Sequence, residues 1–300
     1  MISLSQIYRQ AAGTLVFAFI VAVGLAASAD ELATAKKLYA EKQYPEAQVA
    51  FAAIVQGDPD NAEAAYYLGR LASRRHEFDR AIAWFEKATT LDPHNSGYFA
   101  ELGGAYGDAA DEAAMFSKKN LAKKCLAALE QAVALDPGNL EARNGLVTFY
   151  KRAPRFVGGG MDKAYLQAEE IRRLDPVRGA IVLSDLYLGE KKFAQAYQVC
   201  EATCHEHPEA KTLFFQLGRV CAATGQHLER GEAALKEYLQ CAPKENEPGL
   251  HAAHWQLGAI YEKQGKRDDA RQEYAAALQI KPDFAAAQQA LAKLAASKAE

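Results

Sequence analysis

Two residues at a fixed separation recur along this chain and constrain its fold more than any other feature. A small residue such as Ala47 is followed four positions later by a residue that is usually large and apolar, such as Phe51, and 12 positions later by a proline, Pro59. The same separation recurs seven times in the sequence, at Ala47–Pro59, Ala81–Pro93, Cys125–Pro137, Ala164–Pro176, Ala196–Pro208, Gly231–Pro243 and Ala270–Pro282. Residues four apart share a helix face, and proline cannot continue a helix because it lacks an N–H. The pattern therefore predicts seven helices, each ended by its proline.

A second pattern precedes each of these helices. It reads Leu-Gly-x-x-Tyr at Leu102 and Leu257, with weaker forms starting at Leu68, Leu146, Leu183 and Leu217. Its apolar residues also lie on one face of a helix. Each repeating unit is therefore expected to contain two antiparallel helices, a helix A with the leucine and a helix B with the proline.

The two patterns together resemble the tetratricopeptide repeat family, whose unit has Leu-Gly and Tyr in helix A, then Ala, Phe and Pro. The step from Ala47 to Ala81 is 34 residues, the length typical of that family. The resemblance implies an all-α fold, a right-handed α-solenoid of about seven helix pairs. The expected repeats cover residues 30–61, 62–95, 96–139, 140–176, 177–210, 211–250 and 251–283, and residues 284–300 are expected to form a capping helix in which Leu291 and Leu294 face the last repeat.

Three segments lengthen the period and are expected to be insertions. The segment from Gly107 to Lys119 has a helix-compatible composition, so it is expected to lengthen both helices of the third repeat. The other two, residues 153–160 and 244–249, are rich in Gly, Pro and polar residues and read as loops. Insertions in repeat proteins fall on loops and often carry function. The first loop and the long third repeat also resemble a group of uncharacterised exported bacterial repeat proteins with an AP…GGG…KA loop.

The first 29 residues have the order of a secretory signal. Arg9 is followed by an apolar stretch from Ala11 to Ser28, and Ala27-Ser28-Ala29 is a small-x-small cleavage pattern. The predicted location is therefore periplasmic or secreted, in a bacterium. The alternative is an inner-membrane anchor, because the apolar stretch is just long enough to span a bilayer. Cleavage is favoured because the helical pattern begins immediately at Asp30.

Composition narrows the class of partner. The formal charge of −3 gives no support to a nucleic-acid partner, which normally requires a strong basic excess. No membrane insertion is expected after signal cleavage. Five cysteines are present, an odd number that leaves at least one thiol unpaired in a monomer. The sequence makes no prediction of the oligomeric state.

Few residues suggest chemistry, and the sequence predicts no enzyme activity, no catalytic residue, no cofactor and no metal. Two segments leave an alternative open, a metal- or anion-binding protein or an enzyme. The loop Gly158-Gly159-Gly160 precedes a helix, whose N-terminus favours anions, but it lacks the GK[ST] of a phosphate loop. Cys200, Cys204, His205 and His207 offer zinc-ligand types, although Cys200 occupies a core position of its helix B. His251 and His254 are expected to be exposed.

The binding surface is expected on helix A, on the face away from the recurring leucine and tyrosine. Its candidate residues are aromatic, basic or amide side chains near each leucine, namely Tyr66, Arg70, Arg74, Asn144, Lys151, Arg152, Phe215, Arg219, Trp255 and Lys263. Aromatic and arginine side chains are common anchors of protein interfaces. The sequence therefore predicts a scaffold or adaptor whose concave groove binds a protein or peptide with apolar and acidic residues. The alternative is that these residues are ordinary solvated or packed positions. The Lys and Asn set with which some members of the family grip a chain-end carboxylate is not reproduced, since Asn144 alone matches it.

Overall fold

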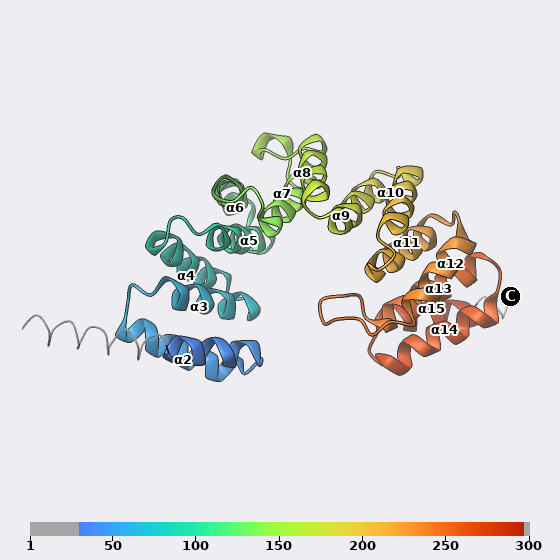
Figure 1. Cartoon of the computed structure of the whole chain (residues 1–300), viewed down its shortest axis with the longest axis horizontal. Helices are drawn as coiled ribbons and strands as arrows, with labels where there is room; N and C mark the ends of the chain where they lie inside the picture. Colours follow the sequence, from blue (N-terminus) through green and yellow to red (C-terminus); the bar gives the residue numbers. More distant parts are fainter. Residues whose placement is uncertain (1–29, 297–300) are drawn as a thin grey trace, which may run out of the picture. The chain divides into compact units, whose positions relative to one another are not determined.

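The computed structural model describes residues 30–296, in which every regular element is helical. The predicted all-α solenoid of paired helices is confirmed. The chain divides between Gly159 and Gly160 into two compact units, unit 1 before this point and unit 2 after it (Figure 1). The division falls inside residues 140–176, which were predicted as one repeat. The predicted signal segment, residues 1–29, lies outside the described residues.

The described part of unit 1 starts with a helix that covers residues 30–40. It continues with α2 (Tyr44–Gly57), α3 (Ala62–Arg74), α4 (Phe78–Leu91), α5 (Ser96–Glu112), α6 (Met115–Leu135), α7 (Leu140–Arg152) and the short 3-10 helix η1 (Arg155–Val157). Helix α5 contacts both α3 and α7, so these three A helices lie in series. The expected lengthening of the third repeat is confirmed, because α5 has 17 residues and α6 has 21.

Unit 2 is made of α8 (Met161–Leu174), α9 (Pro176–Gly189), α10 (Phe193–Glu206), α11 (Lys211–Thr224), α12 (Leu228–Tyr238), α13 (Leu250–Lys263), α14 (Arg267–Ile280) and α15 (Ala285–Ala296). Its A helices α9, α11 and α13 also contact one another in series. Helix α15 packs on α14 and buries Leu294, while Leu291 is partly buried against the same core. Both leucines therefore face the last repeat, as expected.

The Leu-Gly pattern works by close packing within each helix pair. A Cβ added at Gly69 would lie 2.6 Å from Cε1 of Phe85, the large residue of the following helix B. At Gly258 it would lie 2.5 Å from Cε1 of Tyr274. Both rings are almost fully buried. In these repeats the glycine of helix A leaves the space that the aromatic ring of helix B fills, which explains why the two sequence patterns occur together.

Most B helices end two residues before the proline rather than at it. Helix α2, for example, ends at Gly57, before Pro59. The ring of a proline disfavours helical backbone at the residue before it, so the helix stops early. Helix α12 is the exception, because it ends at Tyr238, well before Pro243. The chain then runs into the insertion expected at residues 244–249, and the Tyr238 hydroxyl donates a 2.6 Å hydrogen bond to the Pro248 carbonyl.

The connections before α3, α5 and α7 share the sequence Asp-Pro-x-Asn, and the asparagine caps the next helix. The side chains of Asn61, Asn95 and Asn139 accept hydrogen bonds from the third backbone N–H beyond them, at 3.0, 3.3 and 2.9 Å. Such a cap satisfies a donor that the first turn of a helix leaves unpaired. These repeated turns fix where each A helix of unit 1 begins.

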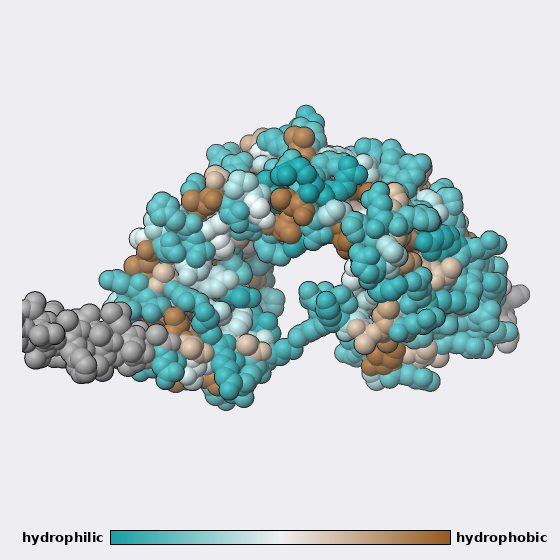
Figure 2. Space-filling model, viewed as in Figure 1, coloured by the Kyte–Doolittle hydropathy of each residue, from teal (hydrophilic) through white to brown (hydrophobic). Residues whose placement is uncertain are grey.

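The surface in view is hydrophilic over most of its area, and hydrophobic residues form small separate patches (Figure 2). No helix among residues 30–296 combines the length and the apolar character needed to cross a membrane.

Candidate functional site

A cavity of about 1010 Å³ lies within unit 1. It is lined by the A helices α3, α5 and α7, by the first half of the lengthened α6, and by residues 153–157 that follow α7. Two of the three segments that break the repeat period therefore form its walls. A volume of this size is at the upper end of the range for ligand pockets.

The floor of the cavity is the face of α5 that carries the smallest side chains. Gly97, Ala100, Gly104 and Gly107 follow each other at steps of three or four residues, so they share one face of the helix. A Cβ at Gly104 would meet no atom within 4 Å. The hollow exists because the sequence places no side chain where the other repeats have one.

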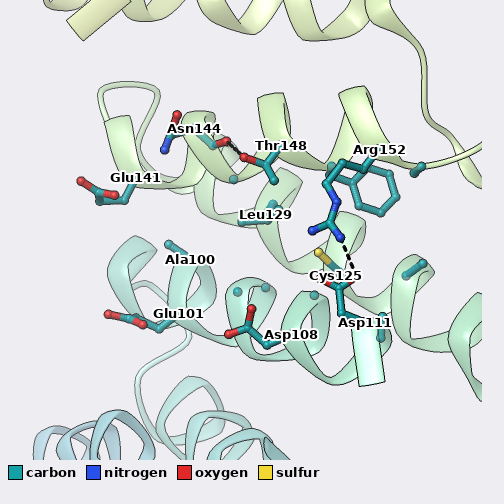
Figure 3. A pocket seen from close by; sticks show the side chains of 18 of the residues that line it. Ala100, Glu101, Asp108, Asp111, Cys125, Leu129, Glu141, Asn144, Thr148 and Arg152 are labelled. Carbon is teal, nitrogen blue, oxygen red and sulfur yellow. Dashed lines mark hydrogen bonds and ion pairs between the residues drawn. The ribbon is translucent and has the colours of Figure 1, made fainter. Parts of the chain in front are cut away.

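Charged side chains of α5 and α7 face each other across this floor (Figure 3). Arg152 on α7 donates to Asp111 on α5, with 2.9 Å between Nη2 and Oδ1. On the other side, Nε of Arg70 lies 3.4 Å from Oε1 of Glu101. The side chains of both pairs are partly exposed, so each contributes little stability, about 1 kcal/mol or less. They fix the edges of the cavity.

Arg70 is also held by aromatic rings. Its guanidinium lies 5.2 Å from the centroid of the Tyr39 ring and 5.6 Å from that of Tyr66. Burial raises the pKa of the Glu101 carboxyl, although the charge of Arg70 and a hydrogen bond from Tyr66 oppose the rise. This end of the cavity is a packed cluster of rings and one ion pair, while the middle stays open.

Cys125 is the one thiol that lines the cavity among the described residues. It is buried on α6, and burial raises its pKa to about 12, with the carboxylates of Asp108 and Asp111 adding to the rise. A thiol with so high a pKa stays protonated at neutral pH and is a poor nucleophile. Cys125 therefore serves as an apolar wall of the cavity.

The structure brings four of the ten predicted groove residues to this cavity, namely Tyr66, Arg70, Asn144 and Arg152. The other two candidates of unit 1 lie outside its lining. Arg74 is exposed and stacks over the Tyr44 ring at 4.0 Å. Lys151 is exposed in the last turn of α7.

The four candidates of unit 2 have a different environment. Phe215 is only 8% exposed and packs against Tyr238, so it is a core residue rather than an open surface residue. Arg219 is bound to Asp185, and Trp255 packs edge-on against Phe284. The fourth candidate, Lys263, is exposed at the end of α13.

The cause of this difference is a set of larger side chains on the A helices of unit 2. The buried amide of Gln216 donates to Ser184 at 2.6 Å and to Asp185 at 2.9 Å, so α11 is tied to α9. Arg219 completes the network through Gln216 and Asp185. Side chains that were expected to contact a partner are used here to hold neighbouring repeats together.

The sequence analysis missed most of the residues that line the cavity, Gly104 and Asp108 among them. Gly104 lies two residues after Leu102, the position of Arg70 and Arg219 in their repeats. Asp108 lies six after it, the position of Arg74, Arg152 and Lys263. The distance from Leu102 therefore indicates that both residues lie on the same face as the predicted groove residues. A criterion of aromatic and basic side chains excludes them, because one is a glycine and the other an acid.

The structure does not favour a metal site at the Cys and His residues of α10. Cys200 and Cys204 are buried, while the His205 side chain is 80% exposed and lies 3.7 Å from Glu201. Burial raises the pKa of Cys200 to about 12, which opposes the thiolate that a metal needs. In the described part of the chain, no three His, Cys, Asp or Glu side chains are arranged to hold a metal ion.

Two backbone donors of the glycine loop are used within the loop. The backbone N–H of Gly158 donates to the Arg155 carbonyl at 3.0 Å, and that of Gly159 donates to the Pro154 carbonyl at 3.1 Å. A Cβ at Gly159 would lie 1.8 Å from the oxygen of Ala153, so this glycine is required by a close backbone contact. The loop is a tight turn.

The expectation that His251 and His254 are exposed is wrong. Nδ1 of His254 lies 2.6 Å from Oε2 of Glu273 on α14, and the His251 ring packs edge-on against Phe284 at 4.9 Å. Both are partly covered, because the first turns of α13 lie against α14 and the residue before α15.

Comparison with known families agrees with this architecture. Models described as tetratricopeptide repeat match residues 38–103 and residues 251–284. With the helix pairs described above, these two matches support a tetratricopeptide repeat protein. A comparison with curated proteins gives no match.

Among solved structures, the chain is similar to a tetratricopeptide repeat protein from Parabacteroides merdae ATCC 43184, with a TM-score of 0.61 at 14% identity over 89% of this chain and 98% of that one. It is also similar to human IFIT1, solved as a dimer with m7Gppp-AAAA, with a TM-score of 0.60 at 20% identity over 86% of this chain and 59% of that one. A third similar structure is Pseudomonas aeruginosa pilF, with a TM-score of 0.51 at 17% identity over 79% of this chain and 99% of that one. At these identities the likeness concerns the fold alone.

Proposed function

We propose that this protein is a non-catalytic scaffold that binds a segment of another protein in the cavity of unit 1. Stacked helical repeats generally serve as protein-binding surfaces. The observation that carries the proposal is the cavity itself, which lies on the A helices α3, α5 and α7 and has a floor of glycine and alanine. In unit 2 the corresponding helices are tied together by buried side chains.

The lining supports a peptide-like ligand over a small apolar one. The side-chain amide of Asn144 forms no hydrogen bond within residues 30–296, so it is available to both an N–H and a C=O of a bound backbone. Gly104 and Gly107 allow that backbone to approach α5 closely. Phe156, which is 75% exposed at the edge of the cavity, offers an apolar contact for a side chain.

The proposed place of action is the cell envelope. This part of the proposal is supported by the sequence of residues 1–29, with Arg9, an apolar stretch and Ala27-Ser28-Ala29. Fractionation of cells that express the chain, with mass measurement of its N-terminus, tests it. Recovery in the cytoplasm with residues 1–29 intact would contradict it.

Selection of short random peptides displayed on phage against the purified chain tests the binding site. We expect the selected peptides to lose affinity by about tenfold or more in the variant Gly104→Trp, because the indole fills the floor of the cavity. The matched control is Gly57→Trp, since Gly57 is also a helical glycine of unit 1 with nothing within 4 Å of an added Cβ, but it lies outside the cavity. Equal binding to both variants, or no enriched peptide, would rule out the cavity as the site.

A further inference from the structure

Charged side chains line the cavity, and ion pairs hold them at its two edges but not at its centre. At the two edges Arg70 pairs with Glu101 and Arg152 pairs with Asp111. Asp108, one turn beyond Gly104 on α5, lines the cavity between these pairs, and its carboxylate points into the space between α5 and α7 (Figure 3). It forms no hydrogen bond and no ion pair with any residue that the structure describes.

The neighbours of Asp108 do not supply the missing cation. Partial burial and the negative charge of Asp111 raise its pKa, and Glu112 adds to the rise. His76 and Arg152 act in the opposite direction but do not cancel these effects. Because Arg152 is already bound to Asp111, a carboxylate remains in the cavity for which a positive group of a ligand would be favourable.

The two lysines at the cavity do not reverse this preference. Lys118 and Lys119 are exposed on the first turns of α6, and Lys119 lies 5.9 Å from the centroid of the Phe156 ring. Neither lysine forms an ion pair with Asp108 among the residues that the structure describes. Asp108 is itself exposed to solvent, so its preference for a basic ligand would arise from direct contact in the cavity, where a charge-assisted hydrogen bond is stronger than a screened interaction at a distance.

The space beside Asp108 is suited to a long basic side chain. Gly104 and Gly107 flank it on the same helix, and an added Cβ at Gly107 would meet only Sγ of Cys125, at 3.5 Å. A lysine or arginine stem could lie along these glycines with its charged end at the carboxylate. The exposed ring of Phe156 lines the same cavity and would contact a neighbouring apolar side chain of the ligand.

We propose that the segment bound in this cavity carries a lysine or arginine that pairs with Asp108, next to an apolar residue that contacts Phe156. This inference rests on the proposed function and names the chemistry of the partner, a basic and apolar protein segment. It replaces the acidic peptide expected from the sequence, because the arginines that suggested such a peptide are paired with acids of α5.

The test uses the peptides selected by phage display against the wild-type chain. We expect their shared sequence to contain a basic residue, and the affinity of a synthetic peptide with that sequence to fall about tenfold or more in Asp108→Asn. The matched control is Asp79→Asn, an exposed helical aspartate of unit 1 outside the cavity. We expect it to bind like the wild type. Replacing the basic residue of the peptide with glutamate should abolish binding to the wild type and restore it in Asp108→Lys.

The outcomes separate this inference from the proposed function. Selected peptides that lack a basic residue, or that bind Asp108→Asn as well as the wild type while still failing to bind Gly104→Trp, would overturn the role of Asp108 and leave the cavity as the binding site. Peptides that bind Gly104→Trp normally, or no enrichment at all, would overturn both.

Discussion

Ala100 of unit 1 and Phe215 of unit 2 occupy the same position of the repeat, two residues before the leucine of helix A. The alanine leaves part of the floor of a cavity of about 1010 Å³, whereas the phenylalanine is buried against Tyr238. Two residues after the leucine the contrast recurs, since Gly104 is open and Arg219 is bound to Asp185. The comparison shows that one repeat pattern can produce either an open cavity or a packed core, depending on the size of the side chains at these positions.

The connections differ as well. In unit 1 each A helix from α3 to α7 is capped by the asparagine of an Asp-Pro-x-Asn turn. In unit 2 the side chain of Asp175 caps α9, while α11 and α13 begin without a side-chain cap. Unit 1 therefore relies on its turns to position the A helices, and unit 2 relies on contacts between their side chains.

The largest expected effect is on stability, at the position two residues before the leucine of helix A. Phe215→Ala should destabilise unit 2 by about 3–5 kcal/mol, because it leaves a void in a packed core. Asn144→Ala, at the same position in unit 1, should change stability by about 0.5 kcal/mol or less. Denaturant unfolding can follow each unit separately, since Trp84 lies in unit 1 and Trp255 in unit 2, and replacing either with phenylalanine leaves one reporter. Similar losses for both variants would remove the distinction.

The second prediction concerns the acid response of unit 2. Burial alone would raise the pKa of Glu232, but hydrogen bonds from Lys236, Gln264 and Lys266 lower it to about 2. Because the folded pKa lies below the unfolded one, the carboxylate stabilises the fold above about pH 4.5, and this contribution disappears as the pH falls toward 2.

Glu232→Gln should therefore cost unit 2 about 2 kcal/mol at pH 7. The difference from the wild type should shrink as the pH falls from about 4.5 to about 2. Unfolding followed through Trp255 over this pH range measures it, and Trp84 should report no change. A difference that persists unchanged at pH 2 would contradict the role of the carboxylate.

A smaller effect distinguishes two adjacent glycines of α5. In Gly103→Ala the new Cβ would lie 2.6 Å from Cγ of Leu129, so unit 1 should lose about 1–3 kcal/mol. In Gly104→Ala it would meet nothing, and the better helix propensity of alanine should add about 0.5–1 kcal/mol. Thermal or urea unfolding of the two variants measures both signs. Destabilisation by Gly104→Ala would show that this face of α5 is not open.

The smallest effect tests the caps of unit 1. Asn61→Ala removes the side chain that accepts from the Ala64 N–H and should cost about 1 kcal/mol. Lys211→Ala, at the first residue of α11 in unit 2, removes no cap and only an exposed ion pair with Glu237, so it should cost less. A cap that contributes nothing in urea unfolding would mean that packing alone positions the A helices of unit 1.

The sequence predicts the helix pairs well because the contacts that form each pair lie within one repeat. The glycine of Leu-Gly and the aromatic residue of the next helix, such as Gly69 and Phe85, form their contact inside one repeat. The register that places Asn144 and Arg152 at the cavity is also local, since it follows from the distance to Leu146.

The charge and openness of the surface have a different cause, because they depend on residues far apart in the chain. The pairing of Arg152 with Asp111 joins residues 41 apart, and that of Arg219 with Asp185 joins residues 34 apart. Periodicity shows that such a residue faces away from its own helix B, but it does not show what the adjacent A helix places opposite. For this reason the sequence predicts a basic groove where the structure pairs the arginines with acids, and an open position where Phe215 is buried.

Photo-crosslinking at matched positions tests the central contrast most directly. A photoreactive phenylalanine analogue is placed at Thr148 on α7 or at Ala259 on α13, both two residues after the leucine of helix A. With a peptide selected against the wild-type chain, we expect crosslinking from position 148, which lines the cavity, and only background from position 259. Crosslinking from position 259 with none from position 148 would contradict the account, since it would place the ligand on unit 2.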